Sequence, residues 1–271
     1  ISGNTGNCCE FLEERLMTEE LMARHTGNAG IVIYGKGQAA IGIDVFCRDR
    51  KGLYEDTPKE ERRLLLTAIE SRELKTLVFT HEHGDHFCLE DVLEALRRNP
   101  ELRIISTGEV IRRIREQEES LGVLTAVSPE ETGFVEAGLL EPGMKLKLFN
   151  TPHMGKQWAD VQSLLCLLEA AGKRLLLPGD ARPDGELFSR TALWSPVIDW
   201  MIAPFPLLGL PSSRKKIAAS LTLRHVLAVH LPRPEKDAHG WRESAVKVCE
   251  RAKDGLPMPI FAGQPGKTYA I

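Results

Sequence analysis

The sequence predicts an α/β protein in which two β-sheets pack face to face and helices cover their outer faces. The first half of the chain contains an apolar hairpin, after which strand-like runs alternate with charged stretches of helical periodicity. The second half repeats this character, with strand-like runs at 163–168, 174–177, 200–203 and 226–229. Two halves of similar length that each combine strands with helices are typical of a four-layer sandwich.

Length and composition favour a single globular domain over residues 1–271. The chain is 42% hydrophobic and 27% charged, which are ordinary values for a globular protein, and layered α/β folds of this length commonly form one unit. The formal net charge of −3 gives no bulk attraction to polyanions, so a nucleic-acid partner is not indicated. No apolar run approaches about 18 residues, so no membrane span is expected.

The N-terminal stretch predicts a helix. Apolar residues recur at helical spacing among charges over residues 9–25, and Thr26, Gly27 and Asn28 form a helix stop. We therefore expect residues 1–26 to form a helical extension of the domain. The stretch lacks the basic and apolar regions of a secretion signal.

The cysteines indicate a reducing compartment. Six are scattered along the chain, and none forms a C-x-x-C pair. A domain of this size does not need disulfides to build a core, so we expect reduced thiols and a cytoplasmic protein. Adjacent Cys8 and Cys9 are interpreted as free thiols, with a metal or redox pair as the alternative. Cys88 is a candidate outer-sphere group beside the motif described below.

Periodicity and turn residues predict the remaining elements. Runs at 31–34 and 39–46 flank a glycine-rich turn and predict a hairpin. The first half should then contain, in order, a helix at 58–71, a strand at 76–79, a helix at 89–98, a strand at 102–106 and a helix at 109–120. A meander over 125–148 should end in a strand at 145–149, and helices are expected at 212–221 and 240–252.

The most informative stretch of the chain is KTLVFTHEHGDHFCL. An apolar strand leads into a polar loop that carries His81, His83, Asp85 and His86. In extended backbone, residues i and i+2 point to the same side, so His81 and His83 can converge on one ion. Gly84 permits a bend that returns Asp85 and His86 to a second position close by. Imidazole and carboxylate are ligands of choice for Zn²⁺ and similar ions, so we interpret the loop as a metal site.

THEHGDH resembles the T-H-x-H-x-D-H signature of the metallo-β-lactamase superfamily. That family places the signature at a strand end ahead of a helix, and its fold is an αβ/βα sandwich with metals at the edge between the two halves. The resemblance implies the same fold here. The family also has an aspartate on the strand behind the metal loop, and Asp44, in IGIDVF, matches it. The resemblance implies that Asp44 orients a ligand; a solvent-facing carboxylate at a strand end is the alternative.

Three further ligand candidates follow apolar runs in the second half. His153 lies in TPHMGK, Asp180 in LLLPGDAR and His230 in LAVHLPRP, each at the tip of a predicted strand. Their order after the histidine loop fits the family pattern. The resemblance implies one ion held by His81, His83 and His153, a second ion held by Asp85, His86 and His230, and a bridge between the two ions through Asp180.

The resemblance also implies a binuclear metal-dependent hydrolase. Two cations would lower the pKa of a bridging water or hydroxide and orient it for attack on a small-molecule substrate. Asp180 or Asp85 would move the proton. The histidine-rich ligands favour Zn²⁺, with two ions per chain and with Mn²⁺ or Fe²⁺ as alternatives. A homo-oligomer is compatible with the sequence.

The segments around the motif resemble one branch of the superfamily. DHFCLEDVLEAL lacks the glycines of the D-H-x-G-G form, GNAG precedes the first strand, and IDWMIAPF forms a late strand. These features are similar to the branch that contains ascorbate-6-phosphate lactonase, over most of residues 27–232. They imply a lactone, ester or phosphodiester substrate. An RNA or cyclic-nucleotide phosphodiesterase shares the metal core, and a non-catalytic metal sensor or scaffold of the same fold is the competing interpretation.

Several side chains near the predicted ligands are candidates for substrate binding. Lys156, Arg182 and Arg233 are placed to recognise a phosphate or carboxylate through charge-assisted hydrogen bonds, with ordinary surface charge as the alternative. His239 is a further candidate because loops beside a rigid site often carry such groups. Trp158 is expected either to wall the pocket or to pack at its rim.

Overall fold

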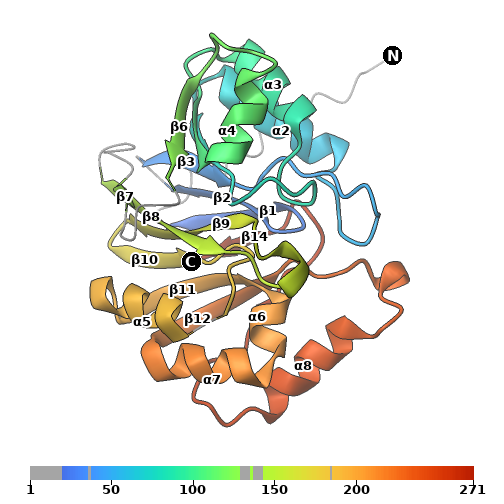
Figure 1. Cartoon of the computed structure of the whole chain (residues 1–271), viewed down its shortest axis with the longest axis vertical. Coiled ribbons are helices and arrows are strands. Elements are labelled where there is room, and N and C mark those ends of the chain that lie inside the picture. The colour runs from blue at the N-terminus through green and yellow to red at the C-terminus, as the bar shows by residue number, and fades with distance from the viewer. Residues whose placement is uncertain (1–19, 36–37, 129–134, 137–142, 184) are drawn as a thin grey trace.

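The computed structural model describes the chain outside residues 1–19, 36–37, 129–134, 137–142 and 184. Two seven-stranded β-sheets stack face to face in the middle of the molecule (Figure 1). Helices from the first half of the chain cover the outer face of one sheet, and helices from the second half cover the outer face of the other. This arrangement confirms the predicted four-layer α/β sandwich.

The first sheet consists of β1 (Met22–Gly27), β2 (Gly30–Gly35), β3 (Gln38–Ile43), β4 (Leu74–Val78), β5 (Arg103–Thr107), β6 (Val123–Val127) and β14 (Thr268–Ala270). The strands lie in the order β14-β1-β2-β3-β4-β5-β6, antiparallel from β14 to β3 and parallel from β3 to β6. Helices α2 (Lys59–Glu70), α3 (Leu89–Arg98) and α4 (Gly108–Arg115) cover its outer face. The carboxyl ends of β3, β4 and β5 therefore meet at one edge.

The second sheet consists of β7 (Val135–Glu136), β8 (Met144–Pro152), β9 (Gln162–Ala170), β10 (Lys173–Leu177), β11 (Val197–Pro204), β12 (Thr222–Val229) and β13 (Ile260–Phe261). Its order is β13-β12-β11-β10-β9-β8-β7, parallel from β13 to β10 and antiparallel from there to β7. Helices α5 (Gly185–Trp194), α6 (Phe205–Gly209), α7 (Pro211–Ser220) and α8 (Trp241–Arg251) cover it (Figure 1). None of the described helices is long and apolar enough to span a membrane.

Side-chain alternation along the central strands divides the core into layers. In β2, Ile31 and Ile33 belong to the buried cluster between the sheets, whereas Val32 and Tyr34 belong to the cluster beneath the first set of helices. Strand β9 divides its side chains in the same way between the inter-sheet cluster and the cluster beneath the second set. Both faces of each sheet are covered, which explains why the strand sequences are near-continuous apolar runs.

Most elements lie where the sequence predicts them. The helix expected at 89–98 is α3 with the same bounds, and the helices expected at 58–71, 212–221 and 240–252 correspond to α2, α7 and α8. Antiparallel pairing of β2 with β3 confirms the hairpin. The helix expected at 109–120 is shorter, because α4 ends at Arg115.

The N-terminal helix prediction is wrong at its carboxyl end. Residues 22–27 form β1, which pairs with β2 on one side and with β14 on the other, while residues 1–19 lie outside the described part of the chain. The cause is tertiary, because Ala23 packs between the sheets and the Arg24 guanidinium pairs with Glu61 of α2. Strand β14, from the opposite end of the chain, is also not predicted, nor are β13, α5 and α6.

Candidate metal centre

The histidine motif forms a tight loop between β4 and α3. The backbone N–H groups of His86 and Phe87 both donate to the His83 carbonyl, at 3.0 and 2.8 Å, so the chain folds back on itself as predicted. Gly84 allows the loop after β3 to approach closely, because a Cβ there would lie 2.8 Å from the Arg48 carbonyl oxygen. The Arg48 N–H donates to the Gly84 carbonyl at 2.6 Å, which ties the motif loop to the loop after β3.

The second half brings three single residues to the same place, each directly after or near the end of a strand. His153 follows β8, Asp180 follows β10 and His230 follows β12. The Met154 N–H donates to the Asp180 carbonyl at 2.8 Å, which joins two of these strand ends. His230 has a left-handed backbone conformation, with φ of 59°, that turns the chain at the end of β12.

The seven predicted ligands converge at the edge between the sheets. Potential ligand atoms within 4.8 Å of one another define three groups: His81 with His83 and His153, Asp85 with His86 and His230, and His81 with His86 and Asp180.

The Asp180 carboxylate lies between the first two groups. Its Oδ2 is 3.5 Å from Nε2 of both His153 and His230, and its Oδ1 is 3.6 Å from His86 Nε2. It is the one described residue whose carboxylate contacts histidines of both groups. This placement matches the bridging position that the family resemblance implies.

Orphaned polar atoms test whether these residues fit a metal. The Nε2 atoms of His86, His153 and His230 and the Oδ1 atom of Asp180 are buried without a hydrogen-bond partner. Buried polar atoms are nearly always paired, because leaving one unpaired costs about 1–3 kcal/mol. Several unpaired nitrogens that converge with a carboxylate suit a soft-to-borderline cation such as Zn²⁺. The residues therefore fit a metal ion in each group.

The electrostatics of the cluster favour a bound positive charge. Burial lowers the pKa of His81 well below its usual value and that of His83 to about 4, which leaves both imidazoles neutral near pH 7. Burial opposes a positive charge on His86, yet the Asp180 and Asp44 carboxylates outweigh it and raise its pKa. The field at this point therefore favours positive charge, which a cation also supplies.

Asp44 lies just past the end of β3, with φ of 52°, and is 2% exposed. It accepts hydrogen bonds from the Thr80 N–H and the Thr80 hydroxyl, both at 2.7 Å, and its Oδ2 lies 2.8 Å from His86 Nδ1. The Thr80 oxygen in turn lies 3.0 Å from His81 Nδ1. When Nδ1 of His81 and His86 is the donor in these contacts, the Nε2 lone pair of each imidazole is left for an ion.

A cavity of about 830 Å³ opens over the cluster. The first half of the chain lines it with four basic side chains, which are Arg48, Arg50, Lys51 and Arg113, and with the acidic side chains of Asp49, Glu82 and Glu90. The second half contributes Trp158 and Trp241. The Trp158 ring stands edge-on to His83, with centroids 4.7 Å apart, so this side chain walls the cavity directly beside the cluster.

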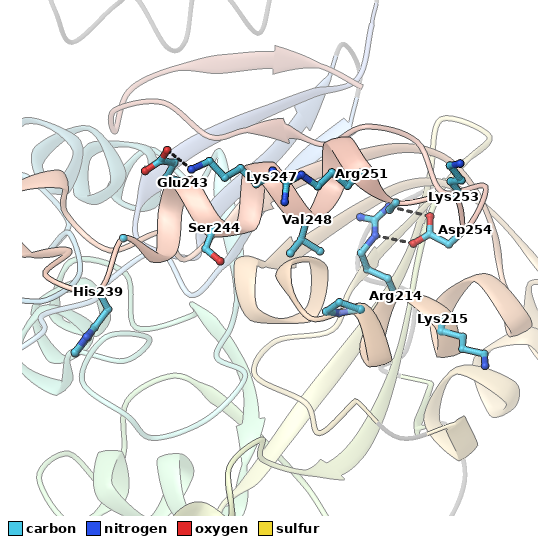
Figure 2. A pocket seen from close by; sticks show the side chains of 13 residues that line it. Arg214, Lys215, His239, Glu243, Ser244, Lys247, Val248, Arg251, Lys253 and Asp254 are labelled. Atoms are coloured by element: carbon cyan, nitrogen blue, oxygen red, sulfur yellow. Dashed lines mark hydrogen bonds and ion pairs between the residues drawn. The ribbon is translucent and has the colours of Figure 1, made fainter.

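The four predicted substrate-binding residues do not line this cavity. Lys156 and Arg182 are absent from its wall, and Arg233 instead donates to the Tyr54 carbonyl at 3.0 Å and pairs with Glu55. His239 lies at one end of a separate groove of about 870 Å³ between α7 and α8, away from the paired Arg214 and Asp254 (Figure 2).

The basic residues that do line the cavity are mostly those that the sequence prediction missed. Arg48, Arg50 and Lys51 belong to the loop after β3, which carries no recognisable motif. The available signal was the charged run CRDRKG close behind Asp44. Lys156, Arg182 and Arg233 are near the ligands in sequence, but none of them lines the cavity.

The described cysteines are free and buried. Cys88 lines the cavity, but its sulfur contacts the Glu90 carboxylate at 3.3 Å, and burial raises its pKa to about 12. It is therefore a neutral thiol near the metal cluster. Cys8 and Cys9 lie outside the described residues.

Comparison with known proteins identifies the fold. No protein-family model matches the sequence, and a search of curated proteins found no significant relative. The structure is similar to YhfI from Bacillus subtilis, a metallo-β-lactamase fold protein, with a TM-score of 0.61 and 12% identity over 92% of this chain and 99% of that one. The chain has the metallo-β-lactamase fold.

Two further solved structures share this fold with similar coverage. Igni18, a metallo hydrolase from the archaeon Ignicoccus hospitalis, has a TM-score of 0.61 and 18% identity over 93% of this chain and 98% of that one. The short form of human tRNase Z has a TM-score of 0.59 and 10% identity over 92% of this chain and 99% of that one. Likeness at such identities shows the fold alone, so function has to be argued from the site.

Proposed function

We propose that the protein is a metal-dependent hydrolase with a binuclear centre. The observation that carries this proposal is the convergence of unpaired, buried imidazole nitrogens around Asp180. The His81 group would hold one ion and the Asp85 group the other, with Asp180 between them. Bound ions would lower the pKa of a water towards neutrality and polarise the substrate's carbonyl or phosphoryl oxygen.

The side chains of the cluster supply the remaining chemistry. Asp85 is partly exposed, lines the cavity and lies 3.2 Å from His230 Nε2, and Asp180 lines the cavity at its floor. Burial alone would raise the pKa of Asp180, but charge on His230 and His86 lowers it well below its usual value. Burial also opposes the charged form of Asp85, but its hydrogen bond with His230 and the charge on His86 lower its pKa. Both carboxylates are thus ionised near pH 7 and can take a proton from the attacking water and return it to the leaving group.

The cavity supports a small anionic ester as the substrate class. Its volume of about 830 Å³ suits a small molecule, and its four basic side chains suit a phosphate or carboxylate. The lactonase-like segments GNAG and IDWMIAPF add support for a phosphorylated lactone, and a phosphodiester has the same charge. Zn²⁺ is the proposed metal, with Mn²⁺ or Fe²⁺ as substitutes. The free, buried cysteines support a cytoplasmic location.

The first test is metal content per chain, measured by elemental analysis of protein purified without added metal. We expect about two ions in the native protein and about one in His83→Ala, which removes one imidazole from the His81 group. A panel of lactones, thioesters and phosphodiesters then tests turnover. Two ions with no turnover on a wide panel would favour a metal sensor or scaffold, and no metal uptake on addition of Zn²⁺ or Mn²⁺ would contradict the proposal.

A further inference from the structure

The turn between β1 and β2 contacts ligands from both halves of the molecule. Asn28, which is 3% exposed, donates from its side-chain Nδ2 to the Asp85 carbonyl at 2.7 Å. Its own carbonyl accepts the His230 N–H at 3.1 Å, and His25 Nε2 lies 3.0 Å from the same oxygen. One residue therefore holds the backbones of two members of the same ligand group.

The backbone of this turn is tightly constrained. Asn28 has φ of 38°, in the left-handed region that asparagine tolerates better than most residues. A Cβ at Gly27 would lie 2.8 Å from the Asp56 carbonyl oxygen, and one at Gly30 would lie 2.8 Å from the Asp44 carbonyl oxygen. The turn is thus packed against the loop that carries Asp44, so the Asn28 amide is presented at a fixed position.

The two ligand groups differ in what supports them. His81 is supported through Thr80 and Asp44, and His153 Nδ1 lies 2.6 Å from the Met154 carbonyl oxygen, with no contribution from Asn28. Asp85 and His230 both depend on Asn28 at the backbone level. Removal of the Asn28 side-chain amide should therefore disturb the Asp85–His86–His230 group and leave the His81–His83–His153 group in place.

We propose that Asn28 is a positioning residue for the Asp85–His86–His230 group and sets the affinity of the ion held there. This inference rests on the proposed function only in taking the two groups as ion sites, and it does not depend on the substrate. Supporting contacts around metal ligands typically contribute about 10–100-fold in metal affinity. The effect should fall on one of two binding steps.

Two substitutions isolate the amide. Asn28→Asp keeps the shape but removes the donor and puts an acceptor against the Asp85 carbonyl, whereas Asn28→Gly keeps the left-handed backbone and removes the side chain. Asn99→Ala is the matched control, because Asn99 is a buried asparagine whose amide donates to the Ile69 carbonyl at 3.2 Å in the helical layer.

The experiment is a Co²⁺ titration of metal-free protein, followed by visible absorption and calorimetry, with thermal unfolding as the folding check. In both Asn28 variants we expect one step to weaken by about 10–100-fold and the other to change less than about twofold. His83→Ala identifies the step that belongs to the His81 group. Asn99→Ala should alter neither step.

Three outcomes would overturn the inference. The first is that both Co²⁺ steps weaken equally, and the second is that the Asn28 variants lose the step that His83→Ala also removes. The third is that both steps stay unchanged in Asn28→Gly. Each would show that Asn28 does not act selectively on the Asp85–His86–His230 group. The failure of the proposed function is distinguishable, because it appears as two normal Co²⁺ steps in the native protein without turnover on any ester. A native protein that binds no Co²⁺ overturns both proposals.

Discussion

The two halves of the molecule build the proposed metal centre in different ways. The first half supplies His81, His83, Asp85 and His86 from one loop that is stabilised by Thr80 and Asp44 of the same half. The second half supplies one ligand at a time, at the ends of three strands. A loop can pre-form its ligands through local hydrogen bonds, whereas the single ligands come together only when the sheet is complete and docked.

The cavity walls differ in the same way. The basic side chains of the wall, such as Arg48 and Lys51, come from the first half together with the acidic Asp49 and Glu90, whereas the two tryptophans, Trp158 and Trp241, come from the second half. Lys51 Nζ lies 5.8 Å from the Trp158 ring centroid, so the two walls approach each other at the rim. This division suggests that charge recognition and shape recognition of the substrate come from different halves.

The largest effect should follow from substitution of Asp180, where the two halves meet. Asp180→Asn keeps the volume but removes the negative charge that lies 3.5 Å from both His153 and His230. We expect kcat/KM to fall by about three orders of magnitude, the scale of losing a principal electrostatic group, together with loss of at least one ion. Steady-state kinetics and elemental analysis measure both.

Asp199→Asn is the control for that substitution. Asp199 is an aspartate of the same sheet, in β11, but it pairs with Arg224 and accepts the Arg174 N–H far from the ligands. Full metal content and full turnover in Asp180→Asn would remove Asp180 from the centre. The two ligand groups would then share no bridging residue.

The second prediction concerns Asp44, which positions the histidine loop of the first half. Asp44→Asn keeps an acceptor for the Thr80 N–H but weakens the hold on His86 Nδ1 and on the Thr80–His81 contact. Because Asp44 supports a histidine of each group, both Co²⁺ steps should weaken by about 10–100-fold. Asp91→Asn is the control, because Asp91 is a buried carboxylate of α3 that pairs with Arg62 of α2 and with Arg48 at 3.5 Å but with none of the ligands. It should leave both steps unchanged.

That outcome would contrast with Asn28, which should affect one step. If Asp44→Asn weakens only one step, the Thr80–His81 contact does not matter for ion binding. Titration of the two variants in parallel thus distinguishes a residue that positions ligands of both groups, Asp44, from one that positions ligands of a single group, Asn28.

The sequence predicts much of this centre because the halves encode their ligands differently. The four-ligand loop is visible as a local motif, since spacing alone places its side chains together. His153, Asp180 and His230 are predictable only as residues at strand tips, and the resemblance to a known ligand order turns three weak signals into one set. Asn28 lies in GNAG, but that segment indicates no role for it, because its role depends on hydrogen bonds to Asp85 and His230, residues distant in sequence.

The errors have a related physical cause. Residues 22–27 have no strong strand pattern of their own, and β1 exists because β2 and β14 offer hydrogen-bond partners on both sides. Likewise, Arg48 and Lys51 reach the cavity because the loop after β3 is tied to Gly84, as seen in the Arg48–Gly84 hydrogen bond. Long-range pairing of this kind leaves no trace in local periodicity.

The third prediction concerns Trp158, which lines the cavity from the second half of the chain. Trp158 is 37% exposed and contacts His83 edge-on, so Trp158→Ala should cost little stability while removing a substrate surface. We expect KM to rise about 2–13-fold, as expected for one lost aromatic contact of about 0.5–1.5 kcal/mol, with kcat changed less than KM. Trp194→Ala is the matched control, since Trp194 is 54% exposed and also has a lysine over its ring.

The smallest effect is expected from substitution of Lys51, a basic side chain of the cavity rim, and it tests whether the substrate is anionic. Lys51→Gln removes one exposed charge from the cavity rim and keeps most of the stem. For a phosphorylated substrate, KM should rise about two- to fivefold at low salt, because an exposed charge contributes about 0.2–1 kcal/mol, and the difference should shrink at high salt. A neutral lactone should show no change, and neither substrate should respond to Lys215→Gln in the groove of Figure 2. Equal KM changes for the charged and neutral substrates would mean that Lys51 acts through shape. Charge recognition could then not be assigned to the first-half side chains of the cavity.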